Sequence, residues 1–209
     1  MAVLHGRCNV LLSLLACKAV SRNGTLDMSD KKTAGPELEV IFTPDAIARR
    51  LSQLALEIAN ERADSLMVVA ILKGSFVFAA DLIRALHGVG LAPEVDFMTL
   101  SSYRKARTSA GQVTILRDMD LDVRGRNVLI IDDVLDSGRT LAFAKDLISA
   151  RGASAIKTCV LLDKRLKRAV NLEPDYCAFE CPDTFVVGYG MDVAHRYREL
   201  PFVGRVVRE

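Results

Sequence analysis

Two adjacent acidic residues, Asp132 and Asp133, stand directly after an apolar run and directly before a short polar loop. The whole stretch, residues 127–140, reads NVLIIDDVLDSGRT. Neighbouring carboxylates repel each other and are costly to desolvate, so this pair indicates sugar hydroxyls, a divalent cation, or both as binding partners. The apolar run predicts a buried strand that ends at the two acids.

The loop after the two acids has the residue types of a phosphate site. Gly138 lets the backbone approach a ligand closely, and Ser137 and Thr140 offer hydroxyl groups. The helix predicted to follow presents free N–H groups to an anion. It is not a Walker loop, because the Gly-Lys-Ser/Thr ending is missing. With the acid pair, the loop predicts a site for a phosphorylated ribose; the alternative is a strand exit in which Asp136 caps the helix.

Length and charge favour one domain that does not bind nucleic acid or a membrane. The chain has 209 residues, enough for a single well-buried core. Its 28 Lys and Arg residues are nearly balanced by 26 Asp and Glu residues, so no strong net field attracts a polyanion.

The five cysteines indicate a cytoplasmic protein with reduced thiols, because their number is odd and they are scattered along the chain. Cys177 and Cys181 resemble half of a zinc site. No second pair or nearby histidine completes a tetrahedral set, and we expect no zinc.

Residues 1–37 are expected to be an N-terminal extension that is disordered or not native, ahead of a domain spanning residues 38–209. Val10 to Ala16, VLLSLLA, resembles the apolar part of a signal peptide, and export is the alternative. That run is far shorter than the ~20 residues that cross a bilayer. We expect the working chain to start at Met28.

The rest of the chain alternates predicted strands with predicted helices, which indicates an α/β domain with a mainly parallel sheet. Thr43-Pro44 supplies a helix N-cap and a proline at the first helical position. Apolar residues then follow at helical spacing. Strands are predicted at Leu38–Thr43, Leu66–Leu72, Val95–Ser101, Asn127–Ile131, Ala155–Leu162, Tyr176–Phe179 and Phe185–Val187, with helices after Pro44, Ser75 and Thr140.

In an open parallel sheet, ligands bind at the carboxyl ends of the strands. Four predicted strand ends carry polar residues, and we expect them to share one crevice. They are Lys73-Gly74, Ser102-Tyr103, Asp132 to Thr140, and Asp163-Lys164.

The segment VLIIDDVLDSGRT resembles the phosphoribosyl-pyrophosphate signature of the phosphoribosyltransferases. The rest of the domain, over roughly residues 38–207, resembles the hypoxanthine (hypoxanthine-guanine) branch of that family, of bacterial type. The segments that carry this second resemblance are LKGSFVFAADL (Leu72 to Leu82), SSY (Ser101 to Tyr103), LLDKR (Leu161 to Arg165), PDTFVVGYGMD (Pro182 to Asp192) and YRELPFVG (Tyr197 to Gly204).

The resemblance implies a type I phosphoribosyltransferase fold, with a small hood formed by the N- and C-terminal segments. It implies a Mg²⁺-dependent purine-salvage enzyme that transfers the 5-phosphoribosyl group of 5-phosphoribosyl 1-pyrophosphate (PRPP) to hypoxanthine and also guanine. The products are IMP or GMP and pyrophosphate. A cytoplasmic homodimer or homotetramer is implied as well.

For the sugar and its phosphates, the resemblance implies a role for each matching residue. Asp132 and Asp133 hold the ribose hydroxyls and position Mg²⁺, and Asp136 is also the catalytic acid or base near purine N7. The Leu72-Lys73-Gly74 turn binds pyrophosphate and contains a non-proline cis peptide. The loop that cradles the 5′-phosphate consists of Asp136, Ser137, Gly138, Arg139 and Thr140.

For the base and the leaving group, Lys164 donates to the 6-oxo oxygen, Phe185 stacks on the purine and the Val186 backbone meets its edge. Asp192 lies on the base side and binds a second Mg²⁺, while Arg198 binds pyrophosphate. Ser102 and Tyr103 lead a flexible loop that serves as a lid. From the residues alone, strand core is the favoured interpretation of Phe185, and the basic run from Lys164 to Arg168 is equally compatible with a solvated turn.

Two alternatives remain open at this point. One is a protein of the same fold that senses PRPP and regulates transcription, although no appended helix-turn-helix pattern is present. The other is a xanthine or pyrimidine phosphoribosyltransferase. Lys164 and Phe185-Val186 favour a 6-oxopurine over a pyrimidine, and acceptance of xanthine stays open.

Overall fold

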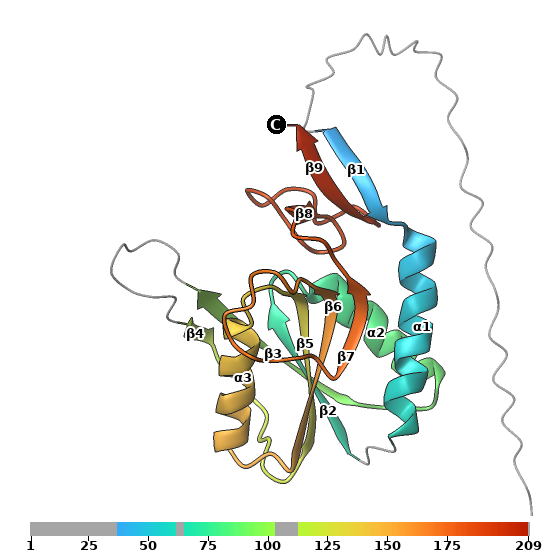
Figure 1. Ribbon diagram of the computed structural model, residues 1–209. Coiled ribbons are helices and arrows are strands. Elements are labelled where there is room, and N and C mark those ends of the chain that lie inside the picture. Colours follow the sequence, from blue (N-terminus) through green and yellow to red (C-terminus); the bar gives the residue numbers. More distant parts are fainter. Residues whose placement is uncertain (1–36, 62–64, 103–112, 209) are drawn as a thin grey trace, which may run out of the picture. The chain divides into compact units, whose positions relative to one another are not determined.

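The computed structural model describes residues 37–61, 65–102 and 113–208 of the chain (Figure 1). Two predictions lie outside these ranges. One is the nature of the N-terminal extension, and the other is the lid position Tyr103.

The described residues form strands and helices that alternate along most of the chain, as predicted. The helices are α1 (Pro44–Asn60), α2 (Phe76–Gly88) and α3 (Arg139–Ala150). The strands are β1 (Glu37–Phe42), β2 (Leu66–Leu72), β3 (Glu94–Ser102), β4 (Val113–Arg117), β5 (Asn127–Leu135), β6 (Ala155–Asp163), β7 (Tyr176–Glu180), β8 (Val186–Val187) and β9 (Val203–Arg208).

Six strands make the main sheet, in the order β4-β3-β2-β5-β6-β7. All neighbouring strands pair in parallel except β3 and β4, which are antiparallel. The predicted mainly parallel sheet is therefore confirmed. β5 lies near its centre and pairs with β2 on one side and with β6 on the other.

Helices cover both faces of this sheet because its strands are apolar on both faces. In β2, Val68 and Ala70 point into a core shared with α1 and α2. The alternate residues Met67 and Val69 point into a second core, which contains Leu141 and other residues of α3. Burial on both faces explains why Leu66–Leu72 reads as a continuous apolar run in the sequence.

Helix α1 begins as the sequence predicts. The Thr43 side chain accepts a hydrogen bond from the Ala46 N–H at 3.3 Å, and Pro44 occupies the first helical position. The predicted apolar stripe is buried, and consists of Ile47, Leu51, Leu54 and Ile58.

The prediction for β5 was too short. The strand was expected to end at Ile131, but it extends to Leu135. Asp132 and Val134 pair with Val160 and Leu162 of β6, so the two acids lie inside the strand instead of beyond it. Hydrogen bonds from the neighbouring strand hold a charged pair in extended backbone that local sequence preference disfavours.

A second, three-stranded antiparallel sheet joins the two ends of the domain. Its order is β1-β9-β8, so β9 lies between β1 from the start of the domain and β8 from near its end. This sheet is the predicted hood. Among the described residues, no helix is both long and apolar enough to cross a membrane.

Asp96 in β3 holds the connection between β4 and β5 in place through hydrogen bonds. Its buried carboxylate accepts hydrogen bonds from the Phe97, Asp120 and Leu121 N–H groups at 2.7, 2.7 and 2.8 Å.

Asp96→Ala should lower the free energy of unfolding by about 2 to 3 kcal/mol, because buried N–H donors lose their acceptor. Urea denaturation measures this loss.

Asp122→Ala is the matched control, because the exposed Asp122 carboxylate accepts a single N–H, from Arg124 at 3.0 Å. It should change the free energy of unfolding by less than about 1 kcal/mol. Equal losses in the two variants would show that the Asp96 contacts contribute nothing particular to stability.

Candidate active site

The carboxyl ends of β2, β5 and β6 lie at one edge of the main sheet, because the three strands run in parallel (Figure 1). Leu135 at the end of β5 pairs with Asp163 at the end of β6, and the Lys164 N–H donates to the Leu135 carbonyl at 2.9 Å. The polar loops that follow these strands therefore begin beside one another. Three of the four strand ends predicted to share a crevice therefore lie at this edge, and the crevice itself stays a prediction.

The acid pair sits at this edge under electrostatic strain. The Asp132 side chain is buried, and its Oδ1 accepts the Asp133 N–H at 3.0 Å. Burial, together with repulsion from the Asp133 carboxylate, raises the pKa of Asp132 well above its ordinary value. A divalent cation or sugar hydroxyls would relieve that cost, which is the chemistry that the residue types indicate.

The turn after β2 lies against the acid pair. The Leu72–Lys73 peptide is cis, as predicted. A Cβ placed on Gly74 would lie 1.7 Å from Asp133 Oδ2, so only glycine permits this close approach. On its other side, the Gly74 carbonyl oxygen would be 2.3 Å from a Cβ on Gly190. The turn is thus held between the acid pair and the segment after β8.

That segment carries Asp192 and Arg198, which pair with each other at 2.7 Å. Arg198 also donates to the Gly190 carbonyl at 2.6 Å, and Asp192 accepts the His195 N–H at 2.8 Å. Asp192 therefore caps a local turn and at the same time orients an arginine near Gly74. These contacts are compatible both with capping of the turn and with a role of Asp192 in the site.

The predicted phosphate loop surrounds a cavity of about 230 Å³. Gly138 has a φ of +81° and is followed by α3, which begins at Arg139. Positive φ is a conformation that glycine adopts without strain, so the sharp turn into the helix depends on this residue. The cavity is lined by Asp132, Val134, Leu135, Asp136, Ser137, Gly138, Thr140 and Leu141.

The predicted base-binding residues come from β6 and from the segment around β8. Lys164 is buried, and its Nζ donates to the Thr184 carbonyl at 2.6 Å. Phe185 precedes β8 and is 57 % exposed, so the prediction that it belongs to this strand is wrong, as is the strand-core alternative. The Thr184 carbonyl that holds this buried ammonium immediately precedes Phe185 in the chain, and an exposed ring together with a buried ammonium suits a flat, oxygen-bearing ligand.

A model of the phosphoribosyl transferase domain matches residues 39–194, which contain the acid pair, the loop and the base-side segment. The chain belongs to the phosphoribosyltransferase family.

Curated relatives place the chain in the hypoxanthine branch of the phosphoribosyltransferases. It is 42 % identical over 173 residues to the hypoxanthine phosphoribosyltransferase of Escherichia coli K12, covering 81 % of this chain and 96 % of that protein. It is 41 % identical over 167 residues to the hypoxanthine-guanine phosphoribosyltransferase of Bacillus subtilis, covering 79 % and 91 %.

Solved structures agree on both the family and the fold. The chain is 40 % identical to a hypoxanthine-guanine phosphoribosyltransferase of Bacillus anthracis, with a TM-score of 0.77, covering 83 % of this chain and 100 % of that one. For the Trypanosoma cruzi hypoxanthine phosphoribosyltransferase in complex with IMP, identity is 34 % and the TM-score 0.76, covering 85 % and 97 %. The resemblance and the fold predicted from the sequence are confirmed.

Sequence reasoning missed the burial of part of the basic run in this phosphoribosyltransferase. Arg165 and Lys167 are exposed, as a solvated turn requires, whereas Lys164 and Arg168 are not. The side chain of Arg168 is 12 % exposed and that of its partner Asp163 only 1 %. The sequence did contain one signal for this buried ion pair: Asp163 ends an apolar strand, and Arg168 follows it five residues later.

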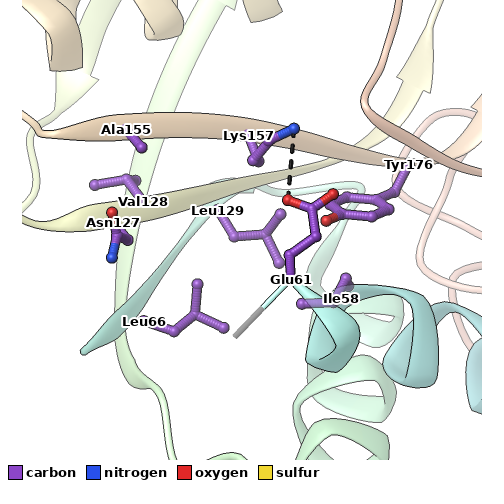
Figure 2. Close-up of a pocket in the computed structure, with 9 residues that line it drawn as sticks. All are labelled: Ile58, Glu61, Leu66, Asn127, Val128, Leu129, Ala155, Lys157 and Tyr176. Carbon is purple, nitrogen blue, oxygen red and sulfur yellow. Dashed lines mark ion pairs between the residues drawn. The ribbon is translucent and has the colours of Figure 1, made fainter. Parts of the chain in front are cut away.

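A second cavity, of about 190 Å³, lies at the other edge of the sheet. Three of its lining residues, Leu66, Asn127 and Ala155, are the first residues of β2, β5 and β6. Figure 2 shows Lys157 and Glu61 pointing toward one another across it, with Nζ and Oε2 3.5 Å apart. Because ligands of open parallel sheets bind at the carboxyl ends, this cavity is not the phosphoribosyltransferase site.

Gly74→Ala tests the close approach between the turn after β2 and Asp133. The added methyl must displace the Asp133 carboxylate or the turn, and misplacement by about 1 Å in an active site costs on the order of 100-fold in rate. Phosphoribosyltransferase activity, measured as kcat/KM, should fall by about that factor.

Gly88→Ala at the end of α2 is the control, because nothing lies within 4 Å of a Cβ at that position. It should retain the activity of the unaltered chain. Equal activity of the two variants would contradict a role for the close approach.

Proposed function

We infer that this protein is a purine-salvage enzyme, a hypoxanthine (hypoxanthine-guanine) phosphoribosyltransferase. It transfers the 5-phosphoribosyl group of PRPP to hypoxanthine or guanine and releases pyrophosphate with IMP or GMP. This conclusion rests on one observation: the chain aligns with nearly the whole length of hypoxanthine phosphoribosyltransferases, and about 40 % of the aligned residues are identical. The contacts at the carboxyl edge of the sheet support it.

The reaction breaks the bond between C1′ of the ribose and the pyrophosphate oxygen and forms a bond from C1′ to a purine ring nitrogen, while the purine ring gives up a proton to the acid or base near N7. The ribose passes through an oxocarbenium-like state, so the protein must neutralise a departing pyrophosphate and orient a weak nucleophile. These demands assign one half of the site to the sugar phosphates and the other to the base.

On the sugar side, the loop from Asp136 to Thr140 cradles the 5′-phosphate, with backbone N–H groups and two hydroxyls as donors. Asp132 and Asp133 hold the ribose hydroxyls. Asp136 also serves as the acid or base near purine N7. Support comes from the polar cavity that this loop surrounds and from its position beside the acid pair.

Mg²⁺ is the cofactor that the acid pair fits. Within the described residues, no three acidic, histidine or cysteine side chains gather into a complete cage. That pattern suits Mg²⁺, which proteins commonly hold through one or two carboxylates together with substrate phosphates. Asp132 and Asp133 would contribute to one ion and Asp192 to a second. When bound, Mg²⁺ neutralises charge that develops on the leaving pyrophosphate.

On the base side, the Lys164 ammonium donates to the 6-oxo oxygen while its bond to the Thr184 carbonyl keeps it in place. Drawing electron density toward that oxygen favours loss of the ring proton. Phe185 stacks on the purine and the Val186 backbone meets its edge. The exposure of the ring and the burial of the ammonium support this assignment.

The leaving group is held by the Lys73-Gly74 turn and by Arg198. The contact of Gly190 with Gly74, and the bond of Arg198 to Gly190, support a joint role. Ser102, at the end of β3, and Tyr103 lead the lid, which excludes water that would otherwise hydrolyse the activated sugar.

PRPP, hypoxanthine or guanine, and pyrophosphate are the proposed binding partners. The related hypoxanthine phosphoribosyltransferase of Trypanosoma cruzi forms a ternary complex with its substrates, as a mutant, and a complex with the product IMP. We propose that the protein acts in the cytoplasm as a homodimer or homotetramer, without a nucleic-acid or membrane partner.

A substrate panel tests the proposed function. Hypoxanthine, guanine, xanthine, adenine and uracil are each incubated with PRPP and Mg²⁺, and pyrophosphate release is followed. Release should be fastest with hypoxanthine or guanine and should stop when EDTA removes Mg²⁺. Release with uracil alone would support a pyrimidine enzyme, and no release with any base would support a sensor of PRPP.

Asp136→Asn tests the acid or base assignment. Loss of a positioned proton-transfer group lowers rates by about 100- to 10,000-fold, so kcat should fall within that range while the melting temperature changes little. Asp146→Asn, on the exposed surface of α3, is the control and should leave kcat unchanged. An Asp136→Asn variant that folds and turns over normally would remove Asp136 from the chemistry.

A further inference from the structure

Arg168 lies in the connection between β6 and β7, with a side chain only 12 % exposed. Its Nε donates to the carbonyl oxygen of Asp136 at 3.2 Å. Its two terminal nitrogens donate to the Leu172 carbonyl and to the Asp163 carboxylate. The guanidinium therefore joins the first residue of the phosphate loop to the last residue of β6, and its fixed fork matches three acceptors that one ammonium could not reach together.

The residues after Arg168 hold the next carbonyl of the loop. Ser137 O accepts hydrogen bonds from the Ala169 and Val170 N–H groups at 2.9 and 3.2 Å. Gly138 completes the contact, because a Cβ on it would lie 3.2 Å from Arg168 Cδ. Two successive carbonyls of the phosphate loop are thus turned toward the segment of residues 168–170.

Peptide geometry gives this arrangement a consequence for the ligand. In a planar trans peptide, the C=O and the following N–H point in opposite directions. Because the Asp136 and Ser137 carbonyls face residues 168–170, the Ser137 and Gly138 N–H groups face away from them. Both residues line the cavity at the phosphate loop, whereas Arg168 does not. The N–H groups are consequently available to an anion in that cavity.

Asp163 holds the Arg168 guanidinium in place. Its carboxylate is 1 % exposed and pairs with Arg168 and, at 3.3 Å, with Nε of Arg165. A buried carboxylate is strongly destabilising unless it is paired, so Asp163 constrains where the Arg168 fork can lie. Arg165 is 62 % exposed, and its other ion-pair partner is Glu180, so the two arginines share an acid but differ in whether they reach the loop.

We propose that Arg168 is a positioning residue for the phosphate loop. Held by Asp163, it orients the Asp136–Ser137 peptide so that backbone N–H groups meet the 5′-phosphate, and it does not touch the phosphate itself. The inference rests on the proposed function for the identity of the ligand. A basic side chain near a phosphate site would ordinarily be interpreted as a direct ligand of the phosphate. The contacts of Arg168 with the Asp136 carbonyl and the Asp163 carboxylate, outside the cavity lining, indicate a positioning role instead.

The test measures binding of IMP and of inosine, which lacks the phosphate, by calorimetry. Variants Arg168→Lys, Arg168→Gln and Asp163→Asn should each raise the Kd of IMP by about 10- to 100-fold, the effect of losing a hydrogen bond to a charged group. The Kd of inosine should change by less than about threefold. Arg165→Lys is the control and should leave both values unchanged, because Arg165 contacts the same acid but not the loop.

Three outcomes would overturn the proposal. A direct phosphate ligand predicts that Arg168→Lys retains IMP affinity while Arg168→Gln loses it, because an ammonium still supplies the charge. A purely structural role predicts that IMP and inosine are weakened by the same factor. Unchanged IMP affinity in Asp163→Asn would remove Asp163 from the arrangement. If the Arg168 variants fail to fold, as judged by thermal unfolding, the Kd values of IMP and inosine for Asp163→Asn alone decide whether the proposal holds.

Binding titrations separate this inference from the proposed function. An unaltered chain that binds IMP but forms none from PRPP and hypoxanthine would count against the function and leave the role of Arg168 measurable. An active chain whose Arg168→Lys variant binds IMP normally would count against the role of Arg168 alone.

Discussion

The hydrogen-bonded register between β5 and β6 is the constraint on which the rest of the site depends. It sets Leu135 opposite Asp163, so that the phosphate loop and Lys164 leave the sheet side by side. A one-residue slip would send every side chain of one strand to the opposite face and separate the two halves of the site. Apolar side chains on both faces of β5 and β6 make such a slip costly, because two cores would lose their packing together.

Around this register, the site is built largely from backbone and from residues that hold backbone. Gly74 and Gly190 permit segments from β2 and from the end of the domain to meet, and Arg198 fastens that contact through the Gly190 carbonyl. Arg168 acts similarly under the phosphate loop.

The regular elements were predictable because their signals are local. The apolar run of β2 and the helical spacing in α1 specify burial residue by residue, and Thr43-Pro44 marks the helix start. The extension of β5 past Ile131 was missed because pairing with β6 overrides the preference of two acids for a strand end. The burial of Arg168 was missed for a related reason, since its acceptors lie on segments far from it in the chain. Family resemblance supplied the roles of residues such as Phe185, whose exposure nothing local indicates.

The exposed Phe185 ring has a thermodynamic consequence for recognition of the base. A purine that stacked on it would remove apolar surface of both partners from water. Such burial lowers the heat capacity of the complex relative to its separate components, and the enthalpy of base binding would become more favourable as temperature rises. Contact with the Lys164 ammonium follows a different temperature course, because it exchanges one set of polar partners for another. The temperature dependence of the binding enthalpy would therefore differ between the base, which contacts this aromatic side chain, and the sugar phosphates, which do not.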